Sequence, residues 1–175
     1  EGASSAQNTI DTTAAGDIWD NTFTSAAGVA YANPGNASAG TKTLRWTLPS
    51  LMDGLAADVS YTGSGTSAEA TVGYALTYTG VEGLSVSYGM GEVAGNTAGT
   101  TGADVMTMKA SFAFGPVTAA MSINDYDITG ASNEEQSSYK ISYSVSDELS
   151  VSYGAETHET TGQSYDEEFS QISVS

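Results

Sequence analysis

The sequence predicts an all-β protein in which one antiparallel, up-and-down sheet is built from strands paired in chain order. Apolar and polar residues alternate with a period of two over many segments, while good helix formers seldom recur at helical spacing. Short turns also alternate with longer polar links. The 175 residues suffice for one domain, and without cysteine there is neither a disulfide nor a thiolate metal site.

The expected strands are eight clearly alternating segments, with a ninth beginning near Phe169. They cover residues 43–48, 55–62, 67–79, 84–91, 105–114, 117–124, 138–145 and 149–154. Short bends at 49–54, 80–83, 115–116 and 146–148 predict antiparallel hairpins with tight turns at one end. The other links are mostly longer and polar, so we expect the long loops at the opposite end.

One face of these strands is apolar throughout, beginning with Leu44, Trp46 and Leu48 in the stretch LRWTLPSLMDGLAADVSY. Every second residue continues this face, and none of its positions carries a charge, an amide or an aliphatic hydroxyl. The side chains of the opposite face are mostly small and hydrophilic. All four basic residues have the parity of that polar face, namely Lys42, Arg45, Lys109 and Lys140.

Alternation alone fits either a soluble sandwich, whose apolar face is internal, or a transmembrane β-barrel, whose apolar face meets lipid. Several predicted strands approach the ~9 to 11 residues that cross a bilayer at a tilt, against ~5 to 6 for ordinary strands. A lipid-facing Lys or Arg would cost ~2 to 4 kcal/mol at the midplane, and the basic residues avoid that face. Strand length and charge placement therefore favour the barrel.

Aromatic residues also favour the barrel, because many lie on the apolar face near a predicted strand end, where interfacial girdles sit. The ordinary preference of strands for aromatic residues is the alternative explanation. The expected girdle comprises Trp46, Tyr61, Tyr74, Tyr78, Tyr88, Phe112, Tyr139, Tyr143 and Tyr153.

The net charge of −17, from 21 acidic and four basic residues, has the wrong sign for nucleic acid and favours cations as partners. Acidic residues crowd the expected long loops, where they would bind divalent cations weakly or form a solvated run of charge. They are Glu134, Glu135, Glu156, Glu159, Asp166, Glu167 and Glu168. The run from Asp125 to Gly130 opens like an EF-hand loop, but Gln136 stands where that loop needs its bidentate Glu.

The stretch TLRWTLPSLMDGLAADVSYTG resembles the strand, turn and strand that follow the constriction loop of Gram-negative general diffusion porins. YALTYTGVEGLSVSYG, FAFGPVTAAMSI and ISYSVSDELSVSYG are similar to the hairpins of that family. The resemblance implies a 16-stranded, usually trimeric barrel of which this chain is an internal portion. Residues 1–42 would be the inward-folded constriction loop and residues 43–175 would be barrel strands.

The same resemblance implies a set of charges at the pore constriction. Asp11, Asp17 and Asp20 lie around apolar anchors and would face Arg45, Lys109 and Lys140 across the water. The alternative is that the basic residues are isolated lumen charges. Three further charged residues are expected on the lumen wall, namely Lys42, Asp58 and Glu69.

The expected function is passive diffusion of small hydrophilic solutes and ions across the bacterial outer membrane, with a preference for cations and no chemical step. The expected partners are outer-membrane lipid, lipopolysaccharide and further copies in a homotrimer, and no cofactor is expected. The lone histidine, His158, is predicted in a polar loop without a catalytic partner. The alternative function is a soluble or surface-displayed β-domain, such as an adhesin or a structural protein.

Overall fold

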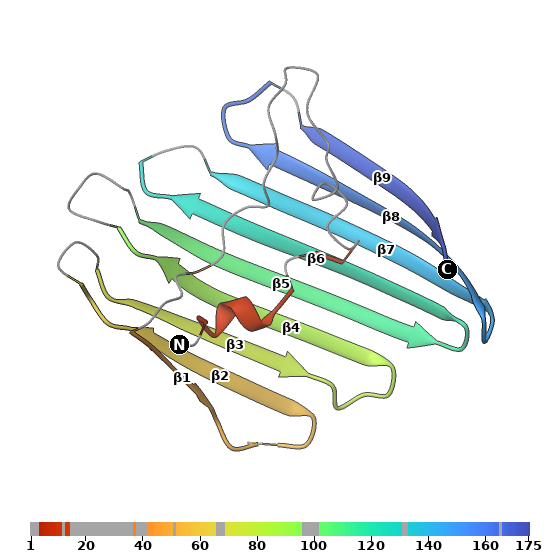
Figure 1. The fold of residues 1–175 in the computed structure, drawn as a ribbon, viewed down its shortest axis with the longest axis horizontal. Helices are drawn as coiled ribbons and strands as arrows, with labels where there is room; N and C mark the ends of the chain where they lie inside the picture. The colour runs from red at the N-terminus through yellow and green to blue at the C-terminus, as the bar shows by residue number, and fades with distance from the viewer. Residues whose placement is uncertain are drawn as a thin grey trace.

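A computed structural model describes residues 4–11, 13–14, 37, 42–50, 52–65, 69–95, 102–130, 133–164 and 166–175. These residues form nine antiparallel strands in one sheet whose spatial order is the chain order, which confirms the predicted all-β, up-and-down fold (Figure 1). The sheet is open, with β1 and β9 at its two edges. In this part of the chain, no helix is long and apolar enough to cross a membrane.

The nine strands and one short 3₁₀ turn account for all the regular elements among the described residues. The elements are η1 (Gln7–Thr9), β1 (Thr43–Thr47), β2 (Leu55–Thr62), β3 (Thr71–Tyr78), β4 (Leu84–Val93), β5 (Ala103–Phe114), β6 (Val117–Ile128), β7 (Glu134–Ser146), β8 (Leu149–Thr160) and β9 (Glu167–Val174).

Successive connections lie at opposite ends of the strands, as the antiparallel order predicts (Figure 1). Two links expected to be long, at 129–133 and 161–166, are short, because the strands beside them extend further than predicted. Three of the tight turns contain a glycine with positive φ, Gly54 at 75°, Gly83 at 76° and Gly115 at 55°. Residues with a side chain seldom adopt this conformation, so these glycines suit their turns. We call the two ends of the sheet the turn end and the loop end.

The strands β6, β7 and β8 extend further toward the loop end than the sequence predicts. Pairing continues through Asp125 and Asp127 in β6 and through Glu134 and Glu135 in β7. The prediction that His158 lies in a polar loop is wrong, because His158 belongs to β8. The alternation of apolar and polar residues ends before the backbone pairing ends, because acidic residues occupy the alternating positions near the loop end. The same correction applies to other acidic residues expected in loops, namely Glu156, Glu159, Glu167 and Glu168.

The cross-strand register places the predicted apolar residues on one face, because directly opposed residues point the same way. Trp46 opposes Val59, which opposes Tyr74, and the pattern continues to β9. This apolar face is open: Leu44 is 72% exposed, Ile141 is 50% exposed and Phe114 is 75% exposed. The polar face contains most of the buried strand residues, and η1 lies against it (Figure 1).

Candidate functional site

The candidate site is the polar face of the sheet together with the N-terminal segment that crosses it, residues 4–11 and 13–14. The segment begins near β2, where the Ala6 backbone N–H donates to Ser60 Oγ over 2.8 Å. It reaches β7, where the Ala14 N–H donates to Ser138 Oγ over 2.7 Å. Polar side chains on the polar face therefore hold the segment's backbone across several strands.

Glycines on β3 and β4 make room for this segment. A Cβ at Gly73 would collide with Ser5 Oγ, and one at Gly91 would lie 3.1 Å from the Cβ of Gln7 and would also collide with Ala37. The two glycines are directly opposed across the strand pair, so together they form a shallow seat in the polar face. Beside this seat, Ala6, Ile10 and Ala75 form a small buried apolar cluster.

A buried polar network joins the segment to the middle of the sheet. Gln7 Nε2 donates to Thr107 Oγ1 over 2.6 Å, and Thr107 Oγ1 donates to Asn124 Oδ1 over 2.5 Å. On its other side, Gln7 Oε1 accepts from the Ala37 backbone N–H over 3.0 Å. Because Gln7, Thr107 and Asn124 are fully buried, an unmade bond here would carry the cost of desolvation. The network therefore fixes the segment in position.

The structure brings two of the predicted constriction charges into contact. Lys109 Nζ donates to Asp11 Oδ2, forming an ion pair, and also donates to the Thr13 carbonyl oxygen over 2.8 Å. Asp11 and Lys109 therefore form a direct ion pair, whereas the sequence predicts that they face each other across water. Asp17 and Asp20, the other predicted acids, lie outside the described residues.

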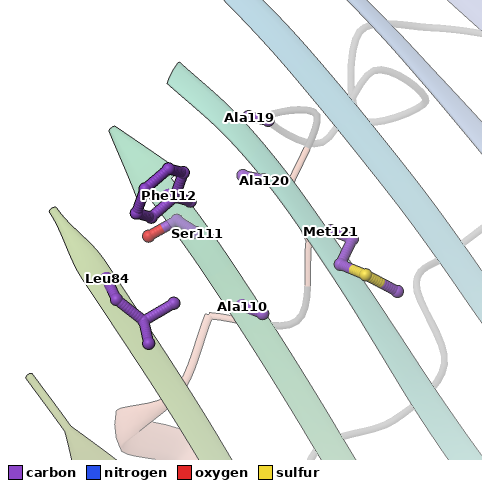
Figure 2. Close-up of a pocket in the computed structure, with 7 residues that line it drawn as sticks. All are labelled: Leu84, Ala110, Ser111, Phe112, Ala119, Ala120 and Met121. Carbon is purple, nitrogen blue, oxygen red and sulfur yellow. The ribbon is translucent and has the colours of Figure 1, made fainter. Parts of the chain in front are cut away.

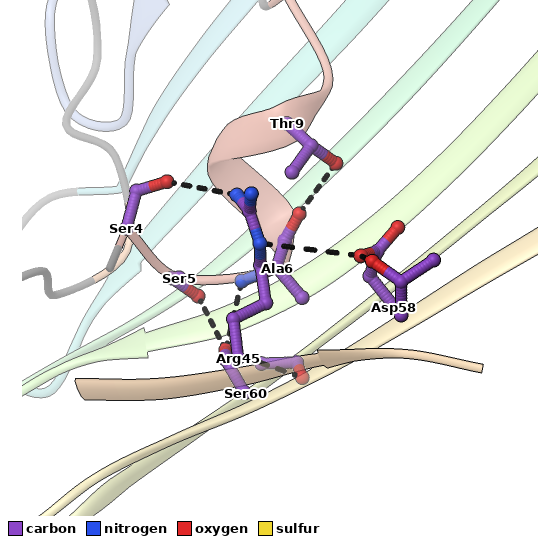
Figure 3. A network of polar contacts seen from close by, with 9 residues as sticks. Ser4, Ser5, Ala6, Thr9, Arg45, Asp58 and Ser60 are labelled. Atoms are coloured by element: carbon purple, nitrogen blue, oxygen red, sulfur yellow. Dashed lines mark hydrogen bonds and ion pairs between the residues drawn. The ribbon is translucent and has the colours of Figure 1, made fainter.

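Arg45 lies toward the β1 edge, next to the start of the segment (Figure 3). Its Nη1 donates to Ser4 Oγ over 3.2 Å, and its Nε is 4.0 Å from Asp58 Oδ1. Asp58 also accepts from Thr47 Oγ1 over 2.6 Å. Both charged side chains retain contact with solvent, so this pair is a weak stabilising element.

The remaining predicted wall charges do not join this group. Lys140 is half-buried on the polar face, opposed by Ala120 and Gly154. Lys42 is exposed at the loop end and donates to the Ser64 carbonyl oxygen over 3.1 Å. Glu69 is exposed and precedes β3, where its backbone N–H donates to the Gly95 carbonyl oxygen over 3.1 Å.

The aromatic residues predicted as a girdle share the apolar face by register, but several lie in strand interiors and not at strand ends. Tyr139 and Tyr153, for example, have ring centroids 6.1 Å apart and lie well inside β7 and β8. Beyond them on the same face come Ser137 and Glu135 in β7. The tyrosines therefore mark the border where the apolar face ends, several residues before the strands end.

Past that border the same face carries carboxylates, which we call the acidic rim. Two runs of directly opposed acids cross neighbouring strands here, an arrangement that like-charge repulsion disfavours. The rim consists of Glu92, Asp104 and Asp127 in one run and Asp125, Glu135 and Glu159 in the other. Because they lie beyond the apolar face, these groups are outside the part of the sheet that could meet hydrocarbon.

The rim changes the ionisation of one of its members. Partial burial raises the pKa of the Glu135 carboxyl, and the facing carboxylates of Glu159 and Asp125 raise it further. No group of three or more His, Asp or Glu side chains arranged to hold a metal ion occurs among the residues the structure describes. The EF-hand-like acids Asp125 and Asp127 lie in β6, so their backbone is extended and not looped.

Near the turn end, the apolar face carries a shallow groove over β4, β5 and β6 (Figure 2). Small side chains at Ala110 and Ala119 leave a volume of about 250 Å³ between Leu84, Phe112 and Met121. No charged side chain lines it. The apolar face is therefore uneven near the turn end.

Sequence reasoning missed Gln7, Thr107 and the glycine seat. A signal was present, because Gly73, Gly89 and Gly91 share the parity of the polar face on consecutive strands. A run of residues without side chains on one face marks a place where another backbone approaches closely.

Comparison with protein-family models, curated protein sequences and solved structures found no match to this chain.

Proposed function

We propose that this chain forms part of the wall of a passive diffusion channel for small hydrophilic solutes and ions, set in a bacterial outer membrane. One observation carries the proposal: the face with the large apolar side chains is exposed across the whole sheet, while polar residues line the face that the segment crosses. An exposed apolar surface of this extent needs an apolar surrounding. In a bilayer, open sheet edges must be closed, so we propose a barrel.

The polar face supports the role of a lumen wall. The segment of residues 4–11 and 13–14 lies on this face and brings the Asp11 carboxylate beside Lys109, with the acid more exposed than the base. A narrowed, charged passage selects solutes by size and by charge. The sixteen strands, the trimer and the contacts with outer-membrane lipid and lipopolysaccharide are parts of the same proposal, and they rest on the porin resemblance.

The acidic excess of the chain supports a preference for cations. The test is to measure single-channel conductance in planar bilayers under a salt gradient. We expect a reversal potential of the sign that indicates cation preference, and we expect it to shrink at high salt because screening shortens the reach of fixed charge. An anion-selective potential would overturn the electrostatic argument, and folded protein without conductance would overturn the channel.

The soluble β-domain is the competing function, and the two differ in what covers the apolar face. Light scattering after removal of detergent separates them. The channel wall should aggregate, since its apolar face would meet water, whereas a soluble domain should stay monodisperse.

A further inference from the structure

A depression of about 400 Å³ lies on the apolar face where β7, β8 and β9 meet. Its floor is Ala155, which is directly opposed by Tyr139 on β7 and by Ser170 on β9. Tyr153 and Thr157 flank Ala155 along β8 on the same face, because side chains of a strand alternate between faces. A methyl group surrounded by larger side chains leaves a hollow.

The walls of this hollow are aromatic on one side and acidic on the other. The rings of Tyr139 and Tyr153 are inclined to each other by 51°, so both contribute to one aromatic corner. Across from them, Glu168 is opposed to Thr157 and lines the same depression as Tyr139. Tyr139, Tyr153 and Glu168 all line the depression.

This combination of groups selects one class of ligand. Aromatic faces attract cations and pack against methyl groups, and a carboxylate supplies the opposite charge. A bare metal ion needs several oxygen ligands, and no described group of three metal-ligating side chains exists here. An anion would meet the Glu168 carboxylate and the negative field of the whole chain.

The geometry points to a binding site for an alkylammonium group, such as the trimethylammonium of choline, between Tyr139, Tyr153 and Glu168 above Ala155. The site goes beyond the proposed channel function and stands without it, because every group that forms it comes from three paired strands. Binding is shallow, so its affinity is set by the two rings and the single carboxylate.

The test follows the ¹³C-labelled methyl group of Ala155 by NMR in the full chain folded in maltoside micelles, while choline chloride is added. We expect a saturable shift of this methyl signal. Tyr139→Leu and Glu168→Gln should each weaken binding by about threefold or more, because each removes one attractive partner. Tyr139→Phe should bind like the parent, since it keeps the ring.

Matched controls test each part of the site. Tyr143→Leu removes a ring from the same face of β7 outside the depression, and Glu159→Gln removes a rim carboxylate from β8. Both should bind choline like the parent. The neutral isostere 3,3-dimethyl-1-butanol should bind more weakly than choline. Equal binding of the two compounds, or equal effects of Glu168→Gln and Glu159→Gln, would overturn the site.

Free ammonium compounds and lipid headgroups share this chemistry, and a second arm separates them. In nanodiscs, a shift of Ala155 on exchanging phosphatidylglycerol for phosphatidylcholine identifies a headgroup as the occupant, while a shift only with added choline identifies a free solute. No shift in either arm overturns the proposal. A choline shift in protein that shows no conductance would refute the channel and leave this site standing.

Discussion

The two faces of the sheet have opposite relations between polarity and burial. On the polar face, Thr107, Asn124 and Gln136 are fully buried. On the apolar face, Leu44 and Phe114 are among the most exposed side chains described. In a soluble domain burial follows hydrophobicity, so the difference indicates that the two faces are adapted to different surroundings. Hydrogen bonds order the polar face, and the surroundings must stabilise the apolar face.

The largest expected effect comes from placing a charge on the apolar face. Ile141→Lys should reduce the free energy of unfolding in lipid vesicles by ~2 to 4 kcal/mol, because the ammonium group would meet hydrocarbon. Ser142→Lys, one residue along and on the polar face, is the matched control and should change stability little. Urea unfolding of both variants measures the difference. Equal stability of the two would show that both faces meet water.

A smaller effect is expected from filling the seat on the polar face. Gly91→Val should destabilise the protein by ~1 to 3 kcal/mol, since the new side chain would collide with Ala37 and would crowd Gln7 of the segment, whose Cβ is 3.1 Å from the position of the added Cβ. Gly63→Ala is the control, because a Cβ there would meet its nearest atoms at 3.9 Å, which is ordinary contact. Denaturant unfolding measures the stability of both variants. An equal loss of stability in the two would show that Gly91 does not make room for the segment.

The ion pair of Asp11 with Lys109 should contribute less. Both side chains are partly exposed, so a double-mutant cycle with Asp11→Asn and Lys109→Gln should give a coupling energy of ~0.2 to 1 kcal/mol. In bilayers, Asp11→Asn should reduce cation preference and Lys109→Gln should increase it. A reversal potential that neither variant moves would show that these charges lie away from the ion path.

The smallest effect concerns the acidic rim and its dependence on pH. The pKa of Glu135 is raised in the folded protein, so the stability it contributes is present below its ordinary pKa of 4.5 and is lost as pH rises through the folded value. Glu135→Gln should therefore stabilise the protein at pH 7 by roughly 0.2 to 0.5 kcal/mol and flatten the pH profile above 4.5. If Glu135→Gln left the dependence of stability on pH unchanged, repulsion between Glu135 and the facing carboxylates would be ruled out.

The strand count and the two faces could be predicted because alternation is a local property of the sequence. The stretch from Leu44 to Tyr61 shows this best, since its hairpin forms between the predicted residues. The ends of β6, β7 and β8 could not be predicted from apolar alternation, because acidic residues replace the apolar ones there while the backbone stays paired.

For the candidate site, the sequence predicted which charged residues lie on the polar face but not the contacts they make. Parity placed Lys109 on the polar face, but its contact with Asp11 joins residues 98 positions apart and depends on how the segment lies. The buried Gln7 gave no signal, because glutamine side chains are mostly exposed in folded proteins. Contacts between a segment and a wall depend on tertiary packing, which residue spacing does not encode.

The order of the strands has a consequence for how the protein folds. Every strand of the sheet pairs only with its neighbours in the chain, so the sheet can grow hairpin by hairpin with small loop closures. The segment is different, because its bonds from Ala14 to Ser138 and from Lys109 to Thr13 span 124 and 96 positions. The sheet is therefore expected to assemble before the segment docks. In the proposed channel, the passage would then be wide when first formed and narrowed only in the last step.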